Sequence, residues 1–209
     1  MGFTGFPEAA LDFYDDLEVD NSKTFWEAHK EVYRTAVAAP MTALLDDLAD
    51  EFGAAKIFRP YRDVRFSKDK TPYKTHQGAF VAVGPATGYY VQLGAAGVRV
   101  GAGFYEANAD RLAFLRRAID DERHGPALEQ VIAKLRRQGW EIGGDTLKTA
   151  PRGWDTGHPR IELLRHRSLV ASRDYGFGEI IGSPALVDRI RKHWRQTRPL
   201  LDWVVEHGA

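Results

Sequence analysis

The hydrophobic period changes twice along the chain, and this order limits the possible folds more than any other feature of the sequence. Apolar residues recur at helical spacing up to residue 52, alternate with other residues from about residue 57 to 105, and return to helical spacing from about residue 108. Helices followed by strands and then by helices are typical of the α+β class. We therefore expect N-terminal helices, a central antiparallel sheet with a hairpin, and C-terminal helices, all within a single domain of residues 1–209.

Three helices are predicted in the N-terminal block. Apolar residues at helical spacing, preceded by a proline suited to a first turn, indicate a helix over residues 7–18. Asn21 has the residue type of an N-cap for a second helix, which Pro40 is expected to end. A third helix over residues 41–52 is expected to stop at Gly53.

The alternating block predicts strands. A short strand is expected around residues 64–66, followed by the strands GAFVAVG, GYYVQLG and GVRVGAGFY. The last two are separated by glycines and alanines that suit a tight turn, so they are expected to form an antiparallel hairpin.

Helical spacing in the last block predicts a helix from about Asn108, another after residues 125–126, and a long helix over residues 183–207 with a kink near Pro199. The segment IELLRHRSLVA, residues 161–171, fits either a helix or a strand. Trp194 and Trp203 in the last helix could belong to the core or to a dimer contact.

The composition excludes several classes of function. The chain has no cysteine, which excludes disulfides, thiolate catalysis, cysteine-ligated zinc and iron–sulfur clusters. Its seven histidines lack the spacing of metal ligands, so no required metal is predicted, and no motif assigns a cofactor. There is no signal-like N-terminus and no apolar run of the roughly 18 residues needed to cross a bilayer. We therefore expect a cytoplasmic protein with no membrane partner.

The formal net charge is zero, but the charges are unevenly distributed. Residues 1–55 contain three bases and twelve acids. Two segments reverse this sign: residues 56–78, with seven bases and two acids, and residues 148–173, with six bases and two acids. We call them the first and second cationic segments. Because the whole chain is neutral, an anion would have to bind at a local site.

The first cationic segment combines arginines at every third position with lysines and aromatic residues. Arginine suits bidentate contacts with carboxylate or phosphate, whereas lysine acts as a point charge. We expect Asp63 to stay ionised and to orient one of the arginines. The expected ligand-binding residues of this segment are Arg59, Arg62, Asp63, Arg65, Lys70, Tyr73 and Lys74.

Two alternatives remain open for the first cationic segment. Its arginines could form a partly buried ion network with the acidic N-terminal helices, or the segment could be a solvated charged loop. The aromatic residues argue against the solvated loop, because Phe58 and Phe66 are expected to anchor the segment in a core.

The first part of the second cationic segment lies in a predicted loop over residues 143–159, which is rich in glycine and proline. Lys148, Arg152 and His158 are expected to complete the anion site. The alternative is a surface loop held by salt bridges. The sequence GGDTLKT lacks the spacing of a P-loop, so a nucleoside triphosphate site is not indicated.

One run of the first cationic segment is specific enough to carry a resemblance. It reads Arg59-x-x-Arg62-Asp63-x-Arg65-Phe66-x-x-x-Lys70-x-x-Tyr73. This run resembles the signature of the bacterial family catalogued as domain of unknown function 2461, and the GYYVQLG hairpin and the KTAPRG element extend the resemblance over nearly the whole chain. The resemblance implies that the cationic segment defines the family. It implies no chemistry, because the family has no assigned function.

The sequence therefore predicts a protein that binds a small anionic, phosphate-bearing molecule in a cleft where the two cationic segments meet. If it is an enzyme, these residues suit electrostatic stabilisation of a developing negative charge. One rival is a nucleic-acid-binding protein that stacks bases on Tyr61, Tyr73 or Tyr89. The other is an interaction or scaffold module whose charges form internal ion networks.

Overall fold

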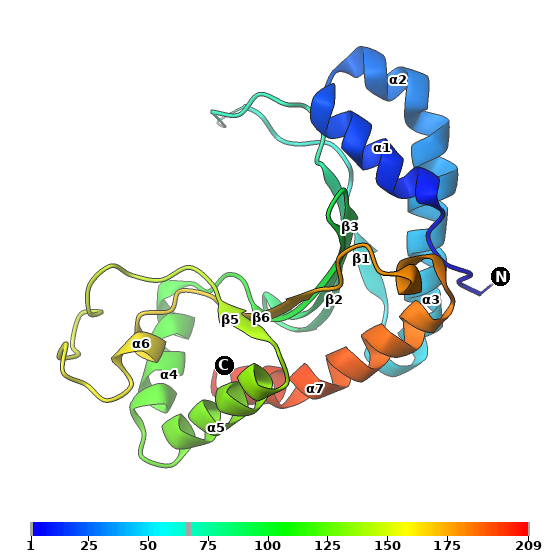
Figure 1. The fold of residues 1–209 in the computed structure, drawn as a ribbon. Coiled ribbons are helices and arrows are strands. Elements are labelled where there is room, and N and C mark those ends of the chain that lie inside the picture. The colour runs from blue at the N-terminus through cyan, green and yellow to red at the C-terminus, as the bar shows by residue number, and fades with distance from the viewer. Residues whose placement is uncertain (1, 66–67, 209) are drawn as a thin grey trace. The chain divides into compact units, whose positions relative to one another are not determined.

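The fold is that of a computed structural model, which describes residues 2–65 and 68–208 (Figure 1). The chain forms two compact units. Unit 1 consists of Met1–Val81, Tyr90–Val100 and Asp174–Lys192. Unit 2 consists of Ala82–Tyr89, Gly101–Arg173 and His193–Ala209. The single domain expected from the sequence stays a prediction.

The N-terminal helices belong to unit 1 and are drawn in blue in Figure 1. They are α1 (Glu8–Val19), α2 (Lys23–Val32) and α3 (Ala39–Phe52). Both the start of α1 and the end of α3 confirm the predictions, because Gly53 follows α3 with a φ of 95° that favours glycine. The apolar stripes of these helices are buried, with Leu17 and Leu44 fully enclosed.

Two predicted helix boundaries were wrong. The N-cap of α2 is Ser22, whose hydroxyl accepts a 3.1 Å hydrogen bond from Phe25 N. The Asn21 side chain instead forms hydrogen bonds with the backbone of Tyr73. Pro40 does not end α2, since residues 33–38 form a π-helix and Pro40 lies in the first turn of α3. Proline is tolerated in a first turn because no N–H is required there.

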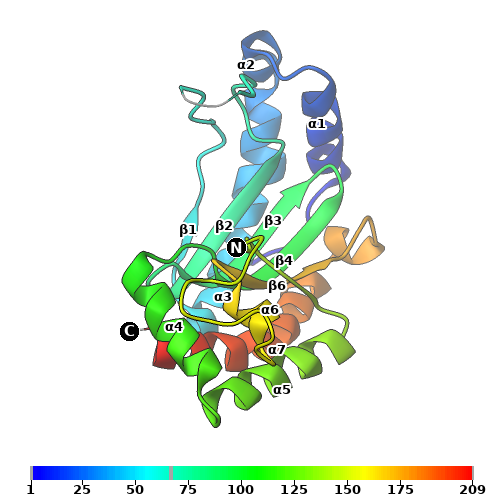
Figure 2. The ribbon, with the colours of Figure 1, turned by 90° about the vertical axis from the view of Figure 1, so that its left-hand side faces the viewer.

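The sheet has six strands in the order β1-β2-β3-β4-β6-β5, and neighbouring strands of the β1–β2 and β5–β6 pairs run antiparallel (Figure 2). The central antiparallel sheet with its hairpins is thereby confirmed. The expected strand around residues 64–66 was wrong for residues 64 and 65, while Phe66 lies outside the described residues. The strands are β1 (Ala55–Ile57), β2 (His76–Gly84), β3 (Thr87–Gly94), β4 (Gly97–Phe104), β5 (Glu141–Gly143) and β6 (Leu169–Asp174).

The helices that precede and follow β5 belong to unit 2: α4 (Ala109–Asp120), α5 (His124–Arg137) and the single turn α6 (Ile161–Leu164). The segment 161–171, which fitted either a helix or a strand, contains a helical turn followed by a strand, because α6 ends at Leu164 and β6 begins at Leu169. Asn108 caps α4 by accepting a 2.9 Å hydrogen bond from Arg111 N, as its residue type indicates.

The last helix, α7 (Ala185–His207), begins in unit 1 and ends in unit 2. Pro199 lies inside it, and the kink there stays a prediction. Trp194 and Trp203 are 0% and 7% exposed, so both belong to the core of unit 2. In the part of the chain that the structure describes, no helix is both long and apolar enough to cross a membrane.

We predict that Gly97→Ala lowers the free energy of unfolding by at least about 2 kcal/mol, which combines left-handed backbone strain with a steric clash. Gly97 opens β4 with a φ of 92°, and an added Cβ would clash with the carbonyl oxygen of Gly176. Gly176→Ala is the matched control, because Gly176 also has a positive φ, 62°, but its Cβ would meet open space. Urea unfolding measures both variants, and equal losses would contradict the steric part of this prediction.

Candidate functional site

The first cationic segment folds into a short antiparallel ladder in unit 1, which we define as residues 58–62 and 72–76. Its two arms extend from β1 and β2 (Figures 1 and 2). A bridge pairs Tyr61 with Tyr73, and two backbone hydrogen bonds of 2.8 Å flank it. The accepting carbonyls belong to two prolines, which cannot donate to a ladder but can accept.

The register of the ladder differs from that of the β1–β2 pair. Ile57 pairs with Ala79, whereas Tyr61 pairs with Tyr73, so four steps along one arm correspond to six along the other. Two extra residues therefore lie on the second arm, as in the special bulges that insert more than one residue. Bulges of this kind turn side chains to new directions, and they are frequent beside functional sites.

Gln77 fills the place where the register changes. Its side chain is 1% exposed, and its amide donates to the carbonyls of Phe58 (2.7 Å) and Gly78 (2.9 Å). Its oxygen accepts a 2.5 Å hydrogen bond from the Tyr33 hydroxyl. A buried amide with all these partners fixes the local backbone, because leaving any of them unpaired would cost free energy.

One face of the ladder is aromatic and packs against α2. The Tyr73 ring stacks on Trp26 with 4.3 Å between ring centroids and 7° between planes, and Tyr61 lies 5.5 Å from Tyr73. Asn21 clamps the same residue through two 3.0 Å hydrogen bonds, one from Tyr73 N and one to Tyr73 O. Tyr73 is only 5% exposed, so it supports the ladder instead of presenting its ring to a ligand.

The other face of the ladder is cationic, because neighbouring residues of a strand point to opposite faces. Arg62 and Lys74 each neighbour the aromatic pair in sequence, and their Cα atoms are diagonal ladder neighbours, about 7–8 Å apart in such an arrangement. Burial lowers the pKa of the Lys74 ammonium, and the charges of Arg59 and Arg62 lower it further. The pKa of His76 is also lowered, first by burial and then by Lys74 and Arg62. We call Arg62, Lys74 and His76, together with Arg59, whose charge also acts on Lys74, the cationic cluster.

Few carboxylates oppose the cationic cluster. Arg62 forms an ion pair with Asp69 in which both side chains are at least 40% exposed. Within residues 2–65 and 68–208, Arg59 and Lys74 have no carboxylate within ion-pairing distance, and the ammonium of Lys74 lies over the Phe58 ring, 5.4 Å from its centroid. The cluster therefore retains positive charge and is partly shielded from water.

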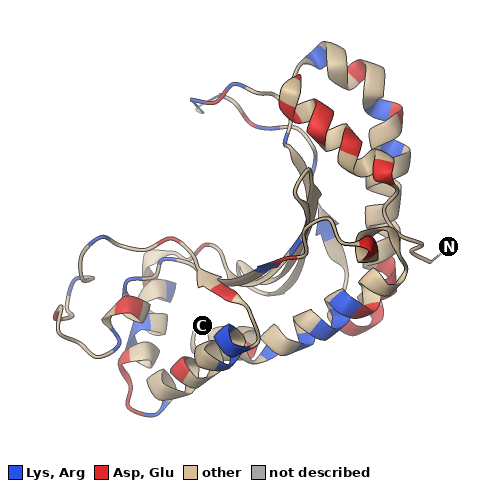
Figure 3. Cartoon of the chain, viewed as in Figure 1, with Lys and Arg blue, Asp and Glu red and all other residues tan. Residues whose placement is uncertain are grey.

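The other predicted residues of the first cationic segment lie in the loop that joins the two arms. Arg65 donates to both oxygens of Asp63, at 3.0 and 2.7 Å, and these bonds hold the pKa of Asp63 below its usual value. Lys70 donates to the Val64 carbonyl at 2.9 Å. For the described residues, the carboxylates that pair with Arg62 and Arg65 come from this segment and not from the N-terminal helices, and Figure 3 shows both charge signs on the arm.

In unit 2, several arginines of the second cationic segment bind backbone carbonyls. Arg160 donates to the carbonyls of Ile119 (2.6 Å) and Asp120 (2.8 Å) at the end of α4. Arg165 donates to the Leu147 carbonyl at 2.7 Å. Such carbonyls have no partner within a helix or loop, so these arginines stabilise the fold around the predicted loop. These arginines hold the loop through backbone carbonyls, whereas the alternative expected from the sequence was a loop held by salt bridges.

The three residues that the sequence predicts as ligands from the second cationic segment differ in their surroundings. His158 Nε2 lies 2.9 Å from Asp120 Oδ1, and the His158 side chain is 16% exposed. Lys148 and Arg152 are exposed, and neither side chain forms an ion pair with another described residue. All three lie in unit 2, whereas the cationic cluster lies in unit 1, so a cleft shared by both segments stays a prediction.

The sequence did not indicate two supports of the site. Asn21 was assigned to a helix cap, and the long-range contact of Gln77 has no local signal. The place of His76 beside Lys74 agrees with the sequence, since the two residues have the two-residue spacing of one strand face. Over the described residues, no group of three or more His, Asp or Glu side chains is arranged to hold a metal ion.

We predict that Asn21→Ala lowers the free energy of unfolding by about 1–3 kcal/mol, because both hydrogen bonds to Tyr73 are lost. The variant Asn21→Asp tests whether Asn21 stabilises the fold through these hydrogen bonds or as a helix cap. Aspartate is as good an N-cap as asparagine but cannot donate to the Tyr73 carbonyl. Thermal or urea unfolding should show a clear loss for Asn21→Asp as well, and an undiminished stability would contradict the clamp.

The comparisons with known proteins identify a family but no activity. Residues 9–203 match the family described as "Conserved hypothetical protein (DUF2461)". No curated protein matches the chain. The match covers nearly all of both compact units, and it includes the ladder and the loop between its arms. The chain therefore belongs to the conserved hypothetical protein family DUF2461.

Proposed function

We propose that the protein binds a small anionic, phosphate-bearing molecule at the cationic cluster of unit 1. The observation that supports this proposal is the charge around Lys74: Arg62 is its diagonal neighbour on the ladder, and the charges of Arg59 and Arg62 both lower its pKa. The carboxylate of Asp69 that pairs with Arg62 is exposed. Like charges held together are unfavourable unless an anion offsets them. A bound anion would relieve the repulsion that now lowers the pKa of Lys74.

The chemistry of the cluster favours phosphate over a single carboxylate. A phosphate group carries up to two negative charges and offers several oxygens, which match two guanidinium groups and one ammonium. The exposed pair between Arg62 and Asp69 is worth only about 0–1 kcal/mol, so a phosphate could displace the carboxylate at little cost. Binding is the function that we propose, and we assign no reaction to these residues.

The other predicted ligand-binding residues have secondary places in this proposal. Arg65 and Lys70, held in the loop by Asp63 and by a carbonyl, could reach a larger anion only by exchanging these partners. A contribution from Lys148, Arg152 or His158 requires the two segments to meet, and it stays a prediction of the sequence. The cytoplasmic location also stays a prediction.

We predict that Lys74→Gln and Arg59→Gln each weaken the binding of pyrophosphate by about tenfold or more, because each removes a charge-assisted hydrogen bond worth about 1.5–3 kcal/mol. Lys68→Gln is the matched control, since Lys68 is exposed, lies in the same segment and carries the same charge. Isothermal titration calorimetry measures the three affinities. If Lys68→Gln weakens pyrophosphate binding equally, the effect comes from the net charge of the segment and not from a specific site. If the unmodified protein binds none of phosphate, pyrophosphate and AMP, the proposal is wrong.

Binding of single-stranded DNA distinguishes a nucleic-acid-binding protein from a protein with a small-molecule site. Of the three tyrosines proposed for stacking, Tyr73 and Tyr89 are buried, and only Tyr61 is exposed, at 51%. A protein that neutralises many phosphates of a nucleic acid binds it with an affinity that falls steeply as the salt concentration rises. Fluorescence anisotropy with a labelled oligonucleotide should therefore show weak binding at low salt, whereas tight and salt-dependent binding would favour the rival over a small-molecule site.

We predict that the pKa of His76 rises when pyrophosphate binds. In the free protein, burial and the charges of Lys74 and Arg62 lower this pKa below the ordinary value of about 6.5. The unfolded chain therefore binds more protons than the folded chain just below pH 6.5, so the stability contributed by His76 falls as the pH drops through that range. A bound anion favours the imidazolium and reverses the shift.

NMR titration of the histidine Cε1–H resonances, assigned with a His76→Gln variant, measures the pKa with and without pyrophosphate. An increased pKa of His76 at saturating pyrophosphate would support a site at the cationic cluster. An unchanged pKa in a protein that does bind pyrophosphate would place the ligand elsewhere. The remaining histidines serve as internal controls in the same spectra.

A further inference from the structure

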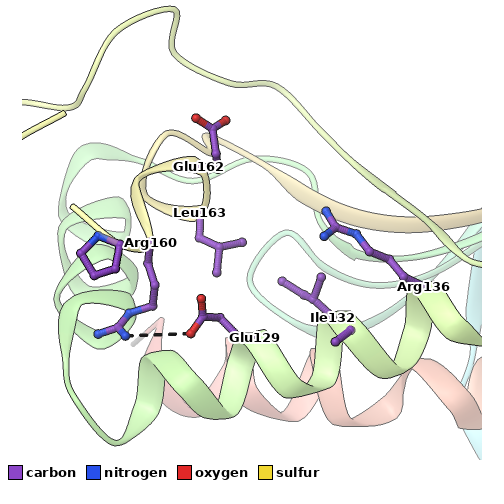
Figure 4. Close-up of a pocket in the computed structure, with 8 residues that line it drawn as sticks. Glu129, Ile132, Arg136, Arg160, Glu162 and Leu163 are labelled. Atoms are coloured by element: carbon purple, nitrogen blue, oxygen red, sulfur yellow. Dashed lines mark ion pairs between the residues drawn. The ribbon is translucent and has the colours of Figure 1, made fainter. Parts of the chain in front are cut away.

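A pocket of about 230 Å³ lies within unit 2, between α5 and residues 159–163 (Figure 4). It is separate from the cationic cluster, and neither cationic-segment prediction accounts for it. Both charge signs and apolar groups occur among its lining residues, which include Glu129, Ile132, Arg136, Arg160, Glu162 and Leu163.

The helix wall of the pocket has opposite charges at its two ends. Glu129, Ile132 and Arg136 follow one another along α5 at spacings of three and four residues, which places them on one stripe (Figure 4). With a rise of 1.5 Å per residue, the backbone positions of Glu129 and Arg136 are about 10.5 Å apart along the axis. Between them lies Ile132, 3% exposed, with Leu163 on the opposite wall.

Both terminal charges retain binding capacity. Glu129 forms an ion pair with Arg160 at 3.9 Å, a distance too long for a hydrogen bond, and the Glu129 side chain is 46% exposed (Figure 4). The guanidinium of Arg160 also donates to carbonyls at the end of α4, so Glu129 does not hold it alone. The Arg136 side chain makes no hydrogen bond or ion pair with any other described residue, because Glu162 pairs with Arg165 at 3.1 Å.

We propose that this pocket binds a small linear zwitterion, with its ammonium group at Glu129, its carboxylate at Arg136 and an apolar segment on Ile132 and Leu163. Each charged end of the ligand meets an opposite charge, and its apolar middle contacts the partly exposed Leu163 beside the buried Ile132. A ligand with one charge would satisfy one end only. Two chemical sources share this pattern, ω-amino carboxylic acids and short peptides.

The size of the pocket limits the length of the ligand. A volume of about 230 Å³ is below the range of roughly 300–1,000 Å³ for drug-sized ligands. An extended peptide spans about 3.3–3.6 Å per residue, so about three residues match the separation of the backbone positions that carry the two charged side chains. An α-amino acid carries both charges on one carbon and is too short to reach both ends.

The ligand series tests the charge pattern directly. We expect 6-aminohexanoate, the tripeptide Ala-Leu-Ala, or both to bind, as measured by calorimetry and by chemical-shift changes on α5. Hexanoate, hexylamine and the acetylated and amidated tripeptide should bind at least about tenfold more weakly, because each lacks one or both end charges. Binding of 6-aminohexanoate alone would identify the ω-amino acid class, and binding of the tripeptide alone would identify peptides.

The protein variants test the location. Glu129→Gln and Arg136→Gln should each weaken zwitterion binding by about tenfold, and Ala133→Phe should block it by filling the pocket. The matched controls are Arg137→Gln on the same helix and Glu122→Gln before it, both at exposed positions. No binding of either zwitterion at millimolar concentration would overturn the proposal, as would Gln variants that bind as tightly as the controls. Pyrophosphate binding at the cationic cluster should be unaffected by all five changes.

Discussion

The stacking of Tyr73 on Trp26 is the contact on which the cationic cluster depends. Because side chains alternate along a strand, burial of Tyr73 turns Lys74 to the opposite face. Two unit charges about 7 Å apart repel by roughly 0.6 kcal/mol in water and about 2.4 kcal/mol at the dielectric of a protein surface. Burying one large apolar side chain stabilises by about 1.5–3 kcal/mol. The aromatic face, together with the clamp of Asn21, is therefore sufficient to hold like charges together.

The parts of the fold that could be predicted are those set by local chemistry. Helical periodicity and Gly53 define α3, and alternation with glycine turns defines β2, β3 and β4. The ladder could not be derived in the same way, since its register depends on a two-residue bulge held by Gln77. That register decides which side chains share a face. That the cations of this segment bind a ligand therefore stays a prediction, and the sequence did not predict that Tyr73, one of the expected ligand-binding residues, is buried.

Charge counts overstated what the second cationic segment offers to a ligand. Arg160 and Arg165 belong to that excess of bases, yet their guanidinium groups are occupied by backbone carbonyls at the end of α4 and in the loop after β5. A carbonyl neutralises no formal charge, so a count of acids and bases cannot detect this use of arginine. The use of arginine to bind carbonyls depends on where helices and loops end in the folded chain. It cannot be recognised before residues about 40 positions apart, such as Asp120 and Arg160, are known to be in contact.

The two proposed sites, the cationic cluster and the pocket on α5, differ in their arrangement of charge. Positive groups act on one another in the cluster, so an anion would be favoured there, and the ammonium of a zwitterion would add to the repulsion. In the pocket, Glu129 and Arg136 lie at opposite ends of an apolar stripe, and Glu129 would repel one end of a multiply charged anion. Under both proposals, each site would reject the ligand class of the other through an unmatched charge. Two ligands of different chemistry could therefore bind the same chain without competing for either site.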